Sequence, residues 1–328
     1  MRETGLRVRL QARLGRVVAA VLPFLPQLAG AAEADAIVLY GAYGSNGSGV
    51  VEGRIIERKS SPEPAASDGK RRNLGRNLRL LINDERAARA LQVRVGGRVL
   101  DAITDAEGYF RVEVTGLDGL PPGWHPVRAI SGEASAEGGL LLVPDANVHG
   151  VISDLDDTIL VSDVSYTGRM LARAFLANPL QREPVPGTAQ LYHGLAERNP
   201  EPLSAPMFYI SGSPRQFYTA IQLFLQHNAY PRGVLITKRI TDDATSEGLR
   251  DQVTYKIGKI SEILARVPKV KYTLIGDDSE RDPEIYAEVQ RLYPERVEAI
   301  WIRRVSPDPE RPRLAGQGDL EELLRTQR

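Results

Sequence analysis

The sequence predicts an α/β domain with a parallel sheet, preceded by an all-β domain. Before Pro144, short runs of alternating apolar and polar residues are separated by turn signals such as Gly96-Gly97, which is typical of antiparallel strands. After Pro144, short apolar runs alternate with helical patterns, which favours parallel strands with helices on both faces. The 328 residues are enough for two domains of ordinary size, and the change of pattern places their boundary near residue 145.

Residues 1–30 have the pattern of an amphipathic helix, with an apolar stripe and arginines on another face. The stripe consists of Leu6, Leu10, Leu14, Val17 and Val21, and the arginines are Arg2, Arg9, Arg13 and Arg16. A signal peptide is the alternative, but Pro23 and Pro26 interrupt its apolar run. The helix would lie on an anionic membrane surface or pack on the protein. We therefore expect a cytoplasmic protein, peripheral at the membrane, with export as the alternative.

Residues 31–145 predict a β-sandwich accessory domain, because about seven short strands follow one another. The expected strands are Ala36–Tyr40, Val50–Ile56, Leu91–Val95, Arg98–Thr104, Tyr109–Val114, His125–Ile130 and Leu140–Val143. The stretch Arg98–Val114 resembles the carboxypeptidase-regulatory or transthyretin-like sandwich repeats. One helix interrupts the strands after the loop Ser60–Gly69. Its basic face is either a patch for phospholipid head groups or a solvated surface, and contains Arg72, Arg76 and Arg79.

Residues 146–305 predict the parallel α/β domain. The expected strands are Val148–Ser153, Met207–Ile210, Val234–Ile236, Tyr272–Ile275 and Val297–Ile302. The expected helices are Pro214–His227, Val253–Val267 and Pro283–Leu292. Residues 306–328 predict a proline-rich tail with a short helix near Asp319–Leu324.

The composition excludes several classes of site. The 42 basic and 42 acidic residues balance, which argues against a dedicated nucleic-acid binder. The chain has no cysteine, so thiol catalysis, zinc–thiolate sites and iron–sulfur clusters are excluded. The 4 histidines lack metal-ligand spacing, which argues against a histidine-rich zinc site. No run of 18 apolar residues predicts a transmembrane helix.

The most informative motif is Asp154-x-Asp156-x-Thr158, directly after a predicted buried strand. Ligands of open parallel sheets bind beyond the carboxyl ends of the strands. Together with Asp157, the two aspartates would repel one another unless a cation or another partner neutralises them. An acidic turn without a ligand is the alternative.

Three further segments bring polar groups to the same edge of the predicted sheet. Ser211 follows the second strand, and Ser213-Pro214 predicts a helix start, which serves as a capping turn or a phosphate cradle. Lys256 lies within the apolar stripe of its helix and therefore needs an anionic partner. A second acidic strand end contains Asp277 and Asp278, and Asp282 is expected to cap the next helix.

These motifs, in this order, resemble the four motifs of the haloacid dehalogenase superfamily of phosphohydrolases. More closely, the chain resembles the actin-patch-type phosphatidate phosphatases, which are distant relatives of the lipins. That resemblance spans roughly residues 148–305 and rests on His149–Thr158, Pro184–Gly187, Tyr209–Pro214, Lys256 and Leu274–Tyr286. It implies a Rossmann-like fold with a small cap and a phosphatase that converts phosphatidate to diacylglycerol with Mg²⁺. The preceding sandwich is also similar to bacterial members.

The resemblance implies a role for each motif residue. Asp154 would be the nucleophile that forms an aspartyl-phosphate, and Asp156 the general acid and base. Mg²⁺ would be held by Asp154, the backbone carbonyl of Asp156 and Asp277, while Asp278 and Asp282 stay open as replacement or support. The phosphoryl oxygens would be bound by Ser211, Gly212 and Lys256. Thr158 would stabilise the turn.

The expected substrate is a phospholipid, and an anionic membrane surface is the expected second partner; the sequence leaves the oligomeric state open. A small helical flap is predicted near Thr167–Ala177. Its region contains Arg169, Arg173 and Arg182, which would meet anionic lipid or be exposed. The alternatives are a phosphatase of a soluble phosphate ester and a non-catalytic phosphatidate-binding membrane module. The presence of both Asp154 and Asp156 favours an enzyme.

Overall fold

The computed structural model describes residues 34–58, 67–69, 86–160, 179–240, 247, 251–305, 311 and 313–326. The helix expected in residues 1–30, the basic helix with Arg72 and the flap at Thr167–Ala177 lie outside these residues. In the described part of the chain, no helix has both the length and the apolarity that a membrane span requires.

The N-terminal strands form one mixed sheet, called sheet A. Its strands are β1 (Ala34–Leu39), β2 (Ala42–Ser45), β3 (Ser48–Arg58), β4 (Ala90–Val95), β5 (Arg98–Ile103), β6 (Tyr109–Val114), β7 (Gly123–Ser131) and β8 (Ala134–Leu142). They pair in the order β1-β3-β2-β8-β7-β4-β5, and β6 pairs with β3. Each of the seven expected strands is confirmed, and β2 was not expected. The division into two packed layers, which a sandwich requires, stays a prediction.

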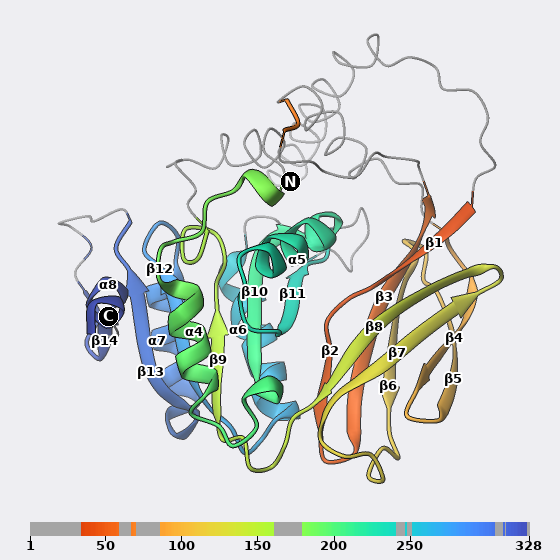
Figure 1. Cartoon of the computed structure of the whole chain (residues 1–328), viewed down its shortest axis with the longest axis horizontal. Coiled ribbons are helices and arrows are strands. Elements are labelled where there is room, and N and C mark those ends of the chain that lie inside the picture. The colour runs from red at the N-terminus through yellow and green to blue at the C-terminus, as the bar shows by residue number, and fades with distance from the viewer. Residues whose placement is uncertain are drawn as a thin grey trace, which may run out of the picture. The chain divides into compact units, whose positions relative to one another are not determined.

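The second sheet, called sheet B, is parallel in all its pairings. Its strands are β9 (His149–Ser153), β10 (Met207–Pro214), β11 (Val234–Lys238), β12 (Lys271–Asp277), β13 (Val297–Arg303) and β14 (Gln317–Asp319). Their order is β11-β10-β9-β12-β13-β14. In chain order this is 3-2-1-4-5-6, the order of doubly wound nucleotide-binding sheets. The parallel sheet expected after Pro144 is therefore confirmed (Figure 1).

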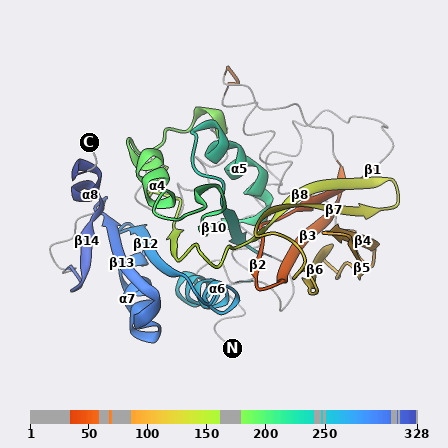
Figure 2. The same cartoon turned by 60° about the horizontal axis from the view of Figure 1, so that its bottom comes forward.

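Helices cover both faces of sheet B, as Figure 2 shows. They are α4 (Thr188–Ala196), α5 (Tyr218–His227), α6 (Gln252–Arg266), α7 (Asp282–Leu292) and α8 (Leu320–Thr326), with short 3₁₀ turns at 179–181, 202–204, 215–217 and 294–296. Neighbouring strand residues point to opposite faces. Accordingly, Ile152 packs in one core with α6 and α7, while Val151 packs in the other with α4 and α5. Within residues 306–328, α8 confirms the short helix expected near Asp319–Leu324, whereas β14 was not expected.

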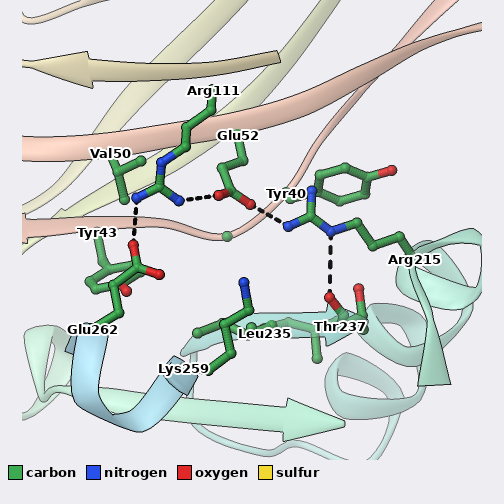
Figure 3. Close-up of a pocket in the computed structure, with 12 residues that line it drawn as sticks. Tyr40, Tyr43, Val50, Glu52, Arg111, Arg215, Leu235, Thr237, Lys259 and Glu262 are labelled. Carbon is green, nitrogen blue, oxygen red and sulfur yellow. Dashed lines mark hydrogen bonds and ion pairs between the residues drawn. The ribbon is translucent and has the colours of Figure 1, made fainter. Parts of the chain in front are cut away.

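Sheet A packs directly against the α/β part of the chain. The ring of Tyr43 on β2 lies 5.0 Å from the ring of Phe208 on β10, within the larger apolar core. Glu52 on β3 accepts hydrogen bonds from Arg111 on β6 and from Arg215, which directly follows β10 in the chain (Figure 3). Arg111 also donates to Glu262 on α6 at 2.5 Å. Apolar packing and an ion network thus hold the two sheets together.

We expect Glu52→Gln to lower the free energy of unfolding by about 2 kcal/mol, because it leaves two guanidinium groups without their shared carboxylate. Breaking a fully buried pair costs roughly 3–5 kcal/mol, and the 16% exposure of the Glu52 side chain reduces that penalty. Urea unfolding measures the change in the free energy of unfolding. Glu113→Gln is the matched control, since Glu113 also pairs with Arg111 but is 54% exposed. If both variants unfolded at the same urea midpoint, the ion pairs of Glu52 would contribute no more to stability than those of the exposed Glu113.

Candidate active site

Polar residues gather where three neighbouring strands of sheet B end. β9 pairs with β10 on one side and with β12 on the other. Asp154 follows β9 directly, Ser211 lies near the end of β10, and Asp277 is the last residue of β12. Because parallel strands present their carboxyl ends at one edge, segments far apart in the sequence meet there. The structure therefore brings together the motifs that the sequence placed at strand ends.

Three aspartates form a buried cluster at this edge. One carboxylate oxygen from each of Asp154, Asp277 and Asp282 lies within 4.8 Å of the others. The side chains are almost inaccessible to water. Burial, reinforced by the charge of Asp282, raises the pKa of Asp277 to about 7. Such a cluster needs positive charge to stay ionised.

Lys256 supplies one positive charge from the inward face of α6. Its Nζ donates to Asp154 Oδ1 at 2.8 Å and also to Asp282 Oδ1. Burial opposes the charged form of this lysine, but the two carboxylates outweigh burial and raise the pKa of Lys256. The helix pattern predicted that Lys256 needs an anionic partner. The structure provides two, the carboxylates of Asp154 and Asp282.

The expectation that Asp282 caps a helix was wrong. α7 begins at Asp282 itself, the cap position is Arg281, and no side chain caps the helix there. The Asp282 carboxylate instead turns toward Lys256, and its Oδ2 is buried without a hydrogen-bond partner in the described residues. Gly276 leaves the space for this approach, because a Cβ there would lie 2.4 Å from Asp282 Oδ2.

Asp278 lies apart from the carboxylate cluster. Its Oδ1 accepts the backbone N–H of Val305 at 2.7 Å. Its Oδ2 lies 3.9 Å from the guanidinium of Arg304. Of the two acids that the sequence left open, Asp282 joins the cluster and Asp278 does not.

Asp156 lies beside the cluster and is half-buried. Its Oδ2 accepts hydrogen bonds from the hydroxyls of Ser211 at 3.2 Å and Ser213 at 3.3 Å. The expectation that Ser213 caps a helix was wrong: β10 continues to Pro214, a 3₁₀ turn follows at Arg215–Phe217, and α5 begins at Tyr218. Ser213 therefore contacts Asp156, and its expected role as a helix cap did not predict this contact.

Two features shape the turn after β9. Thr158 donates its hydroxyl to Asp277 at 3.1 Å and more weakly to Asp154 at 3.4 Å, so it joins the two acidic strand ends as well as the turn. Asp157 adopts a left-handed backbone with φ 59°, which aspartate tolerates better than most residues. Arg303 at the end of β13 donates to the Asp157 carbonyl oxygen at 2.5 Å. The turn is thus supported from two neighbouring strands.

Two other residues named from the sequence, Gly212 and Arg182, also lie near the site. Gly212 lies on β10 next to Ser211, where a Cβ would come within 2.9 Å of the Gln252 side chain. Arg182, expected in contact with lipid or exposed, is half-buried and lines a narrow pocket with Asp156 and Ser211. No periodic pattern in the sequence around Arg182 predicts this position.

Comparisons with known proteins agree with the motifs. Residues 149–304 match the family described as "Phosphatidate phosphatase APP1, catalytic domain". Phosphatidate phosphatase APP1 of Saccharomyces cerevisiae is 31% identical over 157 residues, which are 47% of this chain and 25% of that protein. An uncharacterized protein of Schizosaccharomyces pombe is 26% identical over 213 residues, which are 62% of this chain and 34% of that protein.

A solved carbohydrate acetylesterase from Xanthomonas citri aligns over 80% of this chain and 65% of its own, at 11% identity and a TM-score of 0.27, too low to support any argument. The chain spans between a quarter and about a third of the length of the two curated relatives. Every residue predicted for the site lies inside the matched region. Residues 149–304 are therefore similar to the family of phosphatidate phosphatase catalytic domains, in agreement with the resemblance seen in the motifs.

Proposed function

We propose that this protein is a Mg²⁺-dependent phosphatidate phosphatase that releases phosphate and diacylglycerol. The observation that carries the proposal is the buried cluster of Asp154, Asp277 and Asp282 with Lys256, beside Asp156. The match of residues 149–304 to the phosphatase family supports the substrate class. The fold proposed for this region is haloacid dehalogenase-like with a small cap, preceded by a β-sandwich.

The proposed reaction proceeds in two displacements. The Asp154 carboxylate attacks phosphorus, the bond between phosphorus and the glycerol oxygen breaks, and Asp156 protonates that oxygen. Asp156 then removes a proton from water, which attacks the aspartyl-phosphate, releases inorganic phosphate and restores Asp154. The Ser211 hydroxyl, the Gly212 N–H and Lys256 bind the phosphoryl oxygens and stabilise their charge.

The residues present fit a magnesium ion. The carboxylates of Asp154, Asp277 and Asp282, with the backbone carbonyl of Asp156, would hold it, since Mg²⁺ prefers oxygen ligands. The buried Oδ2 of Asp282, which has no hydrogen-bond partner in the described residues, supports this assignment. When bound, the ion neutralises charge on the carboxylates and on the phosphoryl group.

We expect purified protein to release phosphate from phosphatidate in detergent micelles only when Mg²⁺ is present, and EDTA to abolish the release reversibly. The activity is measured as released phosphate. The soluble substrate p-nitrophenyl phosphate is assayed in parallel. Turnover of the soluble ester alone would favour the soluble-ester alternative. Binding of phosphatidate vesicles without any turnover would favour the non-catalytic module. Docking of the full chain to an anionic membrane surface remains part of the proposal.

A further inference from the structure

Arg182 has no partner among the described residues. It follows the 3₁₀ turn Pro179–Gln181 and is half-buried, yet no hydrogen bond or ion pair joins it to any described side chain or carbonyl. Burial lowers the pKa of Arg182, and the charge of Asp156 opposes that effect. A guanidinium has five N–H donors, and no described residue uses those of Arg182, so they are available to a ligand that brings acceptors.

The pocket that Arg182 lines has a polar end and an apolar wall. Asp156 and Ser211 form the polar end. The remaining lining residues are the apolar side chains Leu155, Leu160, Ile221 and Phe224, all of them buried. A ligand for this pocket therefore carries oxygen acceptors next to hydrocarbon.

The position of Asp156 indicates which part of a substrate lies there. Under the proposed function, on which this inference rests, Asp156 protonates the oxygen that leaves phosphorus. Arg182, which lines the narrow pocket beside Asp156, then faces the alcohol portion of the substrate rather than the phosphoryl group, which Ser211, Gly212 and Lys256 bind. In a diacylglycerol the alcohol portion has ester carbonyl oxygens directly followed by acyl chains.

We propose that Arg182 is a substrate-binding residue that donates hydrogen bonds to the acyl-ester carbonyl oxygens of the leaving glyceride, while the apolar wall contacts the first carbons of the chains. Arg182 thereby distinguishes acylated glycerol phosphates from phosphate monoesters without acyl groups.

The test is a comparison of Arg182→Met with the unmodified chain on two soluble substrates. One is a phosphatidate with two butyryl chains, used below the concentration at which it forms micelles, and the other is glycerol 3-phosphate. We expect kcat/KM for the dibutyryl substrate to fall about tenfold to a hundredfold, mainly through KM, since a hydrogen bond from a charged donor contributes a factor of that order. The value for glycerol 3-phosphate should change less than about threefold.

Two further variants sharpen the result. Arg182→Lys keeps a cation and should recover part of the lost kcat/KM for the dibutyryl substrate. Arg291→Met removes an exposed arginine on α7 that pairs with Glu288, and should change neither substrate. An equal fall for both substrates, or no fall for either, would overturn the role of Arg182. Absence of all turnover by the unmodified chain would instead count against the proposed function.

Discussion

We expect Asp154→Asn to abolish phosphate release from phosphatidate in the presence of Mg²⁺, with kcat lower by on the order of 10⁴-fold or more. The amide is a poor nucleophile and carries no charge for a metal ion. The fold should persist, because Lys256 keeps its second partner, Asp282, on the adjacent helix. Circular dichroism and an unfolding curve check that point alongside the activity.

The matched control is Asp118→Asn, which makes the same chemical change at an exposed position of the all-β part. It should retain full activity. Turnover retained by Asp154→Asn would refute its role as the nucleophile. A variant that loses activity only because it unfolds is recognised by its circular dichroism.

Lys256→Met should have the largest effect on stability. It removes the cation that contacts two of three buried carboxylates, and leaving buried charge uncompensated costs roughly 3–5 kcal/mol. Activity should fall as well, because Lys256 is assigned to the phosphoryl oxygens. Mg²⁺ should restore part of the lost stability, since a cation within the cluster offsets the same repulsion.

Urea unfolding in EDTA and in Mg²⁺ measures both effects for Lys256→Met. Lys269→Met is the control, because Lys269 pairs with Asp145 at an exposed position and should contribute less than about 1 kcal/mol. If Lys256→Met were as stable in EDTA as the unmodified chain, Lys256 would not be what keeps the aspartates ionised.

The sequence predicted the residues of the site better than their contacts. Asp154 and Asp277 could be placed at one edge because each follows an apolar run, and parallel strands end together. The roles of Asp282 and Ser213 could not be decided from the sequence, because each precedes proline and also matches a helix cap. Local capping competes with tertiary contacts: the carboxylate of Asp282 binds a buried lysine, and β10 continues through an irregularity between Ser211 and Pro214.

The sequence contains a local signal for β2 but none for β14 or for the ion pairs of Glu52. β2 and β3 are joined at Asn46-Gly47, both with positive φ, and Asn-Gly is a strong hairpin signal. β14 has three residues and depends on β13 for its pairing, so no local pattern reveals it. The Glu52 network is equally hidden, since Glu52 lies 163 positions from Arg215 in the chain.

The strand order of sheet B has a consequence for synthesis of the chain. β9, which precedes Asp154, is the first strand of its sheet to leave the ribosome, yet it takes a central place. One edge of β9 stays unpaired until β12 is made, and 119 positions separate Thr158 from Asp277. An apolar strand with an open edge invites pairing with other chains. We therefore expect nascent chains that stop short of β12 to aggregate or bind chaperones.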